Sequence, residues 1–133
     1  MVTLNKIYTK TGDGGTTALG DGNRTDKFSL RVNTYGTVDE LNSTVGLATQ
    51  FASKSVLVNL KRIQNDLFDL GADFCKPISV DPTKQKKSDL RILASQVFQL
   101  ETQIDEMNSY LQTLKSFVLP GGSMSSSYLH LCR

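Results

Sequence analysis

The chain has 133 residues, of which 38% are hydrophobic and 21% charged, with a formal net charge of +2. A domain of this size can bury about two thirds of its unfolded surface, so it needs no disulfides to form a core. The small charge argues against a nucleic-acid or anionic-membrane partner, and no apolar run approaches the roughly 18 residues of a spanning helix. Because Cys75 and Cys132 are far apart and residues 1–10 carry no secretory signal, we expect a single cytoplasmic domain over residues 1–133.

The N-terminal third is rich in glycine. Residues 9–22 read TKTGDGGTTALGDG and hold five of the ten glycines in the chain. Glycine disfavours helix interiors, so we expect a loop with short extended pieces, followed by a connector of undefined structure over residues 24–33. Glycines interleaved with Thr and Lys can form a nest of backbone amides that binds an anion.

Two known loop patterns do not fit this segment. Asp21 stands where a P-loop needs its lysine. The run from Asp21 to Asp26 has no glycine at its sixth position, where a calcium loop requires one. Two tight turns, at Asp13-Gly14 and Asp21-Gly22, would explain the glycines as well as an anion nest does.

The first long helix is predicted to begin at Thr37. Thr37 and Glu40 have the spacing of a capping box, and Asp39 and Glu40 would lie in the first turn, where the helix dipole favours acids. An apolar stripe then recurs every three or four residues: Val38, Leu41, Val45, Ala48 and Ala52.

Two further helices are expected after it. Ser55 would cap the first of them, and its stripe runs through Leu60, Ile63, Leu67, Leu70 and Phe74. After a solvated loop over residues 76–87, Ser88 would cap a third helix, whose apolar residues keep heptad spacing from Leu90 to Leu114. Long amphipathic helices joined by short connections favour an all-α, up-and-down antiparallel bundle, here over residues 36–133.

The C-terminal region begins with a break at residues 117–122 (FVLPGG), after which Ser123 or Ser125 would cap a last helix. The chain stops about two turns later, at Arg133, and helices this short are marginal on their own. We therefore expect the C-terminal helices of the bundle to be truncated.

The residues offer little for nucleophilic or metal catalysis. His130 is the only histidine, so neither a catalytic triad nor a metal cage of His and Cys can be assembled. Glu101, Asp105 and Glu106 are explained as a solvated helix face. Phe117 could belong to the core or line a cofactor pocket.

Three segments together resemble a known family. KIYTKTGDGGTTALGDGNRTDK, RVNTYGTVDELNSTVG and FVLPGGSMSSSYLHLCR are similar to three successive signatures of the PduO-type corrinoid adenosyltransferases. The resemblance implies a homotrimer of helix bundles that holds ATP at each subunit interface. It implies transfer of the 5′-deoxyadenosyl group of ATP to cob(I)alamin with release of triphosphate, and Mg²⁺ on the phosphates. Reduced cobalt is the nucleophile, which agrees with the missing triad.

The resemblance also assigns roles to individual residues. Residues 1–33 become the phosphate-binding segment, and Lys27 supplies a further phosphate contact. Asp39 is expected to pair across the interface with Arg133, and Phe117 to close the lower face of the corrinoid. The residues expected around the triphosphate are Thr9, Lys10, Thr11 and Gly12, with Thr17 and Ala18 nearby.

One departure from the family leaves an alternative open. The family's LHxxR signature continues into an arginine-rich stretch and a last helix, whereas this chain stops at Arg133. A non-catalytic homologue that only binds ATP or a corrinoid is therefore the main alternative, and a structural bundle without ligand is a third. As protein partners, the resemblance suggests a reductase or an adenosylcobalamin-dependent enzyme.

Overall fold

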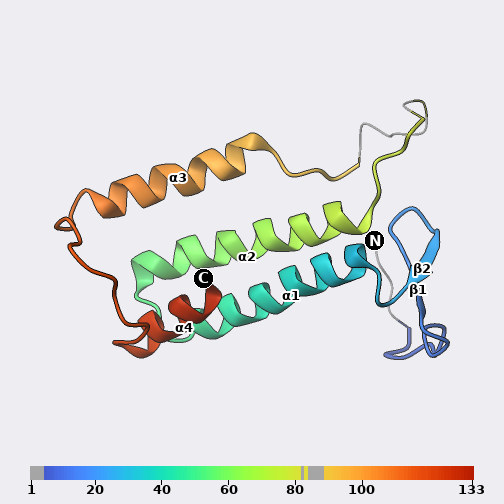
Figure 1. The fold of residues 1–133 in the computed structure, drawn as a ribbon, viewed down its shortest axis with the longest axis horizontal. Helices are drawn as coiled ribbons and strands as arrows, with labels where there is room; N and C mark the ends of the chain where they lie inside the picture. The colour runs from blue at the N-terminus through green and yellow to red at the C-terminus, as the bar shows by residue number, and fades with distance from the viewer. Residues whose placement is uncertain (1–4, 82, 84–88) are drawn as a thin grey trace.

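The computed structural model describes residues 5–81, 83 and 89–133. Within them the chain forms an antiparallel bundle, in which α1, α2 and α3 alternate in direction and a small β hairpin stands at the end where α1 begins (Figure 1). This confirms the predicted all-α, up-and-down architecture with an N-terminal glycine-rich loop. No helix in the described residues has the length and apolar character needed to cross a membrane. The elements are β1 (Thr16–Ala18), β2 (Arg24–Asp26), α1 (Leu30–Thr49), α2 (Lys54–Cys75), α3 (Ala94–Asn108) and α4 (Met124–Cys132).

The core lies where α1, α2 and α4 meet. Val45, Ala48 and Leu60 are its buried residues, and all three belong to the predicted apolar stripes. From α4, Tyr128 packs against them and stacks on Phe51 with ring centroids 5.5 Å apart. Stacked rings at this separation add to the stabilisation from buried area, so α4 is fixed to the second half of α1.

The first helix begins seven residues earlier than predicted, at Leu30. The hydroxyl of Thr37 donates to Asn33 O at 2.9 Å, as a residue inside a helix does, so the predicted capping box is wrong. Asp39 and Glu40 consequently lie mid-helix, and the dipole argument does not apply to them. The helix runs through Gly36 because packing against α2 offsets the cost of an interior glycine, about 1 kcal/mol.

Of two other predicted helix starts, that of α2 differs slightly from the structure and that of α4 agrees with it. Helix α2 begins at Lys54 after Ser53, rather than after Ser55, and the two serine hydroxyls are 3.1 Å apart. Helix α4 follows Ser123, whose side chain accepts a hydrogen bond from Ser126 N at 3.2 Å. The cap predicted at Ser123 is therefore confirmed.

Helix α3 is shorter than its heptad pattern predicted. It starts at Ala94, and the predicted cap Ser88 lies outside the described residues. At its C-terminal end the Ser109 hydroxyl donates to Glu106 O at 2.7 Å. Such local side-chain bonds compete with the helix pattern, and Leu111 and Leu114 lie beyond the end of the helix.

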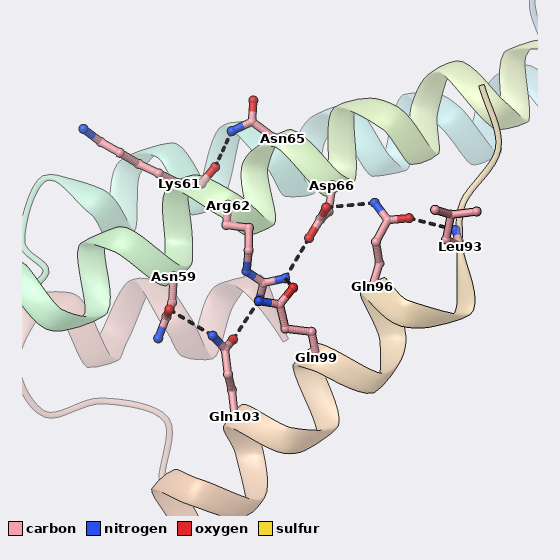
Figure 2. Close-up of polar contacts among 9 residues, drawn as sticks. All are labelled: Asn59, Lys61, Arg62, Asn65, Asp66, Leu93, Gln96, Gln99 and Gln103. Carbon is pink, nitrogen blue, oxygen red and sulfur yellow. Dashed lines mark hydrogen bonds and ion pairs between the residues drawn. The ribbon is translucent and has the colours of Figure 1, made fainter. Parts of the chain in front are cut away.

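The contact between α2 and α3 is made by polar side chains (Figure 2). Arg62 donates to Gln99 at 2.9 Å and to Gln103 at 2.7 Å, while its ion pair with Asp66 spans 3.0 Å. Because polar side chains make this contact, the apolar stripe of α3 stays largely exposed to solvent in this chain: Val97 is 51% exposed and Ile104 is 59% exposed. No residue of α3 is therefore part of the buried core in the described chain. The side chains of this polar seam are Asn59, Arg62, Asp66, Gln96, Gln99 and Gln103.

Candidate functional site

The glycine-rich segment folds into a two-stranded hairpin preceded by a tight loop. Ala18 pairs with Arg24 at the end of the ladder, and Gly22 turns the chain with φ +88°. Asp21 accepts from the Asn23 backbone at 3.0 Å and from its side chain at 2.8 Å. These two bonds lower the pKa of Asp21. The predicted turn at Asp21-Gly22 is confirmed.

The loop before β1 is closed by two successive backbone hydrogen bonds. Asp13 N donates to Lys10 O and Gly15 N donates to Gly12 O, each at 3.2 Å. Lys10 has a φ of +59°, in the left-handed region that non-glycine residues rarely occupy. Strain of this kind concentrates at ligand sites. The loop over residues 9–15 is therefore a strong candidate for binding.

Lys27 covers this loop at Gly12. A Cβ added at Gly12 would lie 2.9 Å from both Cε and Nζ of Lys27 and 3.3 Å from Thr16 O. The Lys27 backbone N–H also donates to Gly15 O at 2.9 Å. A lysine ammonium thus sits directly over exposed loop backbone, an arrangement suited to an anion.

Most of the predicted phosphate residues are assembled in this place. The hydroxyls of Thr9 and Thr11 are 2.9 Å apart at the start of the loop. Thr17 and Ala18 follow on β1, where they pair with Thr25 and Arg24. We name residues 9–15 together with Lys27 the phosphate loop, after the ligand that we propose for it below.

The hairpin and the first turn of α1 are both attached to the end of α2, and neither contact was predicted from the sequence. Gly20 N donates to Cys75 O at 2.9 Å, and Arg31 donates to Phe74 O at 2.7 Å. The last carbonyls of a helix lack partners within the helix, and these donors satisfy two of them. A Cβ at Gly20 would lie 3.1 Å from Lys76 Cβ, so glycine permits the close approach.

The same end of α2 holds the segment that leads to α3. Asp73 pairs with Arg91 at 2.5 Å and accepts from Ile92 N at 2.8 Å. Partial burial raises the pKa of Asp73, but the hydrogen bonds from Ile92 and Arg91 outweigh it, so the net pKa lies below the ordinary value. Lys76 adds an ion pair to Asp89.

This lowered pKa predicts acid sensitivity that depends on Asp73. A carboxylate with a depressed folded-state pKa contributes stability above its unfolded pKa, near 4, and loses it as pH falls through the folded value. The urea midpoint of the wild type is therefore expected to fall more steeply than that of Asp73→Asn between about pH 5 and pH 2.5. Equal pH profiles for the two proteins would contradict this assignment, and Asp105→Asn on the exposed face of α3 is the control.

Asp39 lines a groove between α1 and α2 with a volume of about 360 Å³. Within the described chain no hydrogen bond or ion pair joins Asp39 to Arg133, which follows α4. Phe117 is fully exposed in the 109–123 connection, which lies at the opposite end of the bundle from the hairpin (Figure 1). One chain therefore does not gather all the predicted site residues. The groove is lined by Tyr35, Gly36, Val38, Asp39, Asn42, Leu67, Phe68, Gly71 and Ala72.

Comparison of the chain with known proteins identifies its family. The sequence profile of the cobalamin adenosyltransferases matches residues 7–133. The chain belongs to this family. It is 45% identical over 134 residues to the corrinoid adenosyltransferase of Mycobacterium tuberculosis, covering 99% of this chain and 68% of that one. The match to the Bacillus subtilis corrinoid adenosyltransferase is 44% over 133 residues, with 96% and 65% covered.

A solved structure of the family is similar to the whole fold. It is a variant PduO-type ATP:corrinoid adenosyltransferase from Lactobacillus reuteri complexed with cobalamin and ATP. The TM-score is 0.85 at 34% identity, and the match covers 96% of this chain and 70% of that one. This chain thus spans roughly two thirds of the length of its relatives.

Proposed function

We propose that this cobalamin adenosyltransferase transfers the 5′-deoxyadenosyl group of ATP to cob(I)alamin. The electron pair on reduced cobalt forms a bond to C5′, the C5′–O bond breaks, and triphosphate leaves with that bonding pair. The observation that carries the proposal is the lysine over the phosphate loop, in a chain similar to corrinoid adenosyltransferases along its whole length. The protein's share of the work is positioning and charge stabilisation.

The phosphate loop is the proposed binding site of the triphosphate. Thr9, Lys10, Thr11 and Gly12 would surround it with amide and hydroxyl donors, and Lys27 would neutralise charge that develops as triphosphate leaves. Thr17 and Ala18 would lie beside it on β1. Mg²⁺ would add Lewis-acid neutralisation on the phosphates. No group of three or more His, Cys, Asp or Glu in the described residues could hold a metal, so phosphate and water oxygens would be its main ligands.

Phe117 is proposed to cover the lower face of the corrinoid. A fully exposed phenylalanine leaves a large apolar surface without contact. A flat, largely apolar macrocycle would bury that surface and exclude water from the cobalt. Cob(I)alamin is the substrate in this scheme, and the corrinoid would stay bound until the carbon–cobalt bond has formed.

A homotrimer is proposed because one chain leaves the site divided. The phosphate loop and the connection that carries Phe117 lie at opposite ends of the bundle (Figure 1). Phe68, in the groove beside Asp39, is 72% exposed, and exposed apolar surface of this kind marks interfaces. A neighbouring subunit would bring its Arg133 to Asp39 and complete the site.

Asp39→Asn is therefore expected to weaken assembly. Losing one partner of an interface charge pair leaves the other charge unpaired and weakens association by roughly tenfold or more. Sedimentation velocity should show the trimer dissociating at higher protein concentration than in the wild type. Asp105→Asn removes an exposed charge from α3 and should leave the mass unchanged. A wild-type chain that is monomeric at every concentration would contradict the trimer.

The main alternative is a family member that binds ATP or a corrinoid without catalysis. Mixing the chain with chemically reduced cob(I)alamin and MgATP, and following the visible spectrum, separates the two. Conversion to adenosylcobalamin supports the enzyme. ATP binding without conversion supports the alternative.

The cellular setting follows from the same chemistry. Cysteines 75 and 132 are free thiols, and with the ATP requirement this favours the reducing cytoplasm. Because cobalt must arrive fully reduced, a reductase is the expected supplier, and an adenosylcobalamin-dependent enzyme the expected recipient.

A further inference from the structure

Arg24 joins the phosphate loop, at Thr11, to Thr16 at the start of β1. It lies on β2, and its Nε donates to the Thr16 hydroxyl at 3.0 Å. Its Nη2 donates to the same hydroxyl at 2.6 Å, to Thr16 O at 3.1 Å and to Thr11 O at 2.8 Å. One planar guanidinium thus joins the loop before β1, β1 itself and β2.

The bond to Thr11 O determines the orientation of a backbone amide. In a trans peptide the C=O of one residue and the N–H of the next point in opposite directions. With Thr11 O held toward Arg24, the N–H of Gly12 must point away from the guanidinium. In the described part of the chain this N–H has no hydrogen-bond acceptor, so it remains available to a ligand.

Gly12 is also the residue over which Lys27 lies. The Lys27 ammonium is 2.9 Å from the place where a Gly12 Cβ would be. The free Gly12 amide and the lysine charge therefore belong to one small region of the loop. Backbone amides and a cation together are the usual elements of a phosphate site.

We infer that Arg24 is a positioning residue that holds the Thr11-Gly12 peptide in its anion-receptive orientation before ATP arrives. The inference rests on the proposed function and adds to it a residue that acts through the loop backbone. Its benefit is preorganisation: without the clamp, the peptide must be ordered when ATP binds, and binding weakens. Lysine cannot replace arginine here because a single ammonium lacks the rigid fork that reaches several acceptors.

The test compares Arg24→Lys, which keeps the charge, with Arg24→Ala, which removes it. Calorimetry with MgATP and with inorganic triphosphate gives affinities, and steady-state adenosylation gives KM and kcat. Both variants are expected to raise Kd and the KM for ATP by about tenfold, the value of a lost charge-assisted hydrogen bond. The kcat at saturating ATP should stay within about twofold, because the bound complex restores the loop.

Thr16→Val provides a second variant that leaves every charge in place. It removes the hydroxyl that accepts hydrogen bonds from both Nε and Nη2 of Arg24. We expect the Kd for MgATP to rise by about threefold. A lower ¹⁵N order parameter at the Gly12 amide in ligand-free Arg24→Lys, measured by NMR relaxation, would report the loosened peptide directly. Lys61→Ala, an exposed charge on α2, is the control and should bind ATP as the wild type does.

The outcomes separate this inference from the proposed function. Wild-type affinity in Arg24→Lys with weakened binding in Arg24→Ala would mean that charge alone matters, and would overturn the clamp. Wild-type affinity in both variants would overturn it as well. If the wild type binds neither MgATP nor triphosphate, the proposed function itself fails.

Discussion

Replacing Gly12 by alanine is expected to weaken MgATP binding by about a hundredfold. The new Cβ would lie 2.9 Å from Cε and Nζ of Lys27 and 3.3 Å from Thr16 O. The flexible end of Lys27 would shift away from its place over Gly12, and the Cβ would obstruct the loop backbone beside Thr16 O. We expect each of these two effects to weaken binding by roughly tenfold. Isothermal calorimetry with MgATP measures the loss.

Gly14→Ala is a closely matched control for this prediction. A Cβ at Gly14 would meet nothing within 4 Å, and Gly14 is absent from the glycines with positive φ. Its affinity is expected to stay within about twofold of the wild type, the range of a surface substitution without a special role. If Gly12→Ala and Gly14→Ala bind MgATP equally well, the phosphate loop is not where the triphosphate lies.

Lys27→Ala is expected to raise the Kd for MgATP by roughly ten- to a hundredfold. A hydrogen bond between charged groups contributes about 1.5–3 kcal/mol, which corresponds to that range. The loop itself should persist, because the Lys27 backbone bond to Gly15 O does not depend on the side chain. The rate of adenosyl transfer at saturating ATP should also fall, since the lysine would stabilise the departing triphosphate.

Lys61→Ala removes an equal charge from the exposed surface of α2 and controls for net charge. If it weakens ATP binding as much as Lys27→Ala does, general electrostatic attraction explains the effect and the local contact does not. A Lys27→Arg variant adds a check on geometry. Arginine keeps the charge but is larger, so only partial recovery of affinity is expected.

The sequence predicted the bundle because apolar periodicity is a strong signal. Val45, Ala48 and Leu60 were expected on apolar stripes and form the buried core. The serine cap at Ser123 was also readable, since a side-chain cap is a local interaction. The start of α1 was not predictable in this way, because the capping-box spacing of Thr37 and Glu40 resembles a helix boundary. Packing of α1 along α2 overrode this local signal.

The polar seam shows a different limit of sequence reasoning. Glutamines on α3 carry no signal that distinguishes a solvated face from one that contacts α2. The seam is defined by the hydrogen bonds from Arg62 on α2 to Gln99 and Gln103 on α3 (Figure 2). These partners are 37 and 41 residues from Arg62 in the sequence, so no local pattern indicates them.

The candidate site was predictable in its residues more than in its geometry. Lys27 and Gly12 were assigned through family resemblance, and the structure brings them together. Arg24 and Arg31 were missed because their roles depend on carbonyl groups of other segments, Thr11 O and Phe74 O. Side-chain bonds to backbone carbonyls leave no mark in a residue pattern. An arginine just after the glycine-rich segment of residues 9–22 is the signal that the sequence offers.

The most direct test of the central claim is one turnover with ATP labelled with ¹³C at C5′. The 133-residue chain, chemically reduced cob(I)alamin and labelled MgATP are mixed anaerobically and analysed by ¹³C and ³¹P NMR. The account predicts that the label becomes bonded to cobalt and that one intact triphosphate is released for each adenosylcobalamin formed. Labelled ATP that remains unchanged, or that yields phosphate without a carbon–cobalt bond, would contradict it.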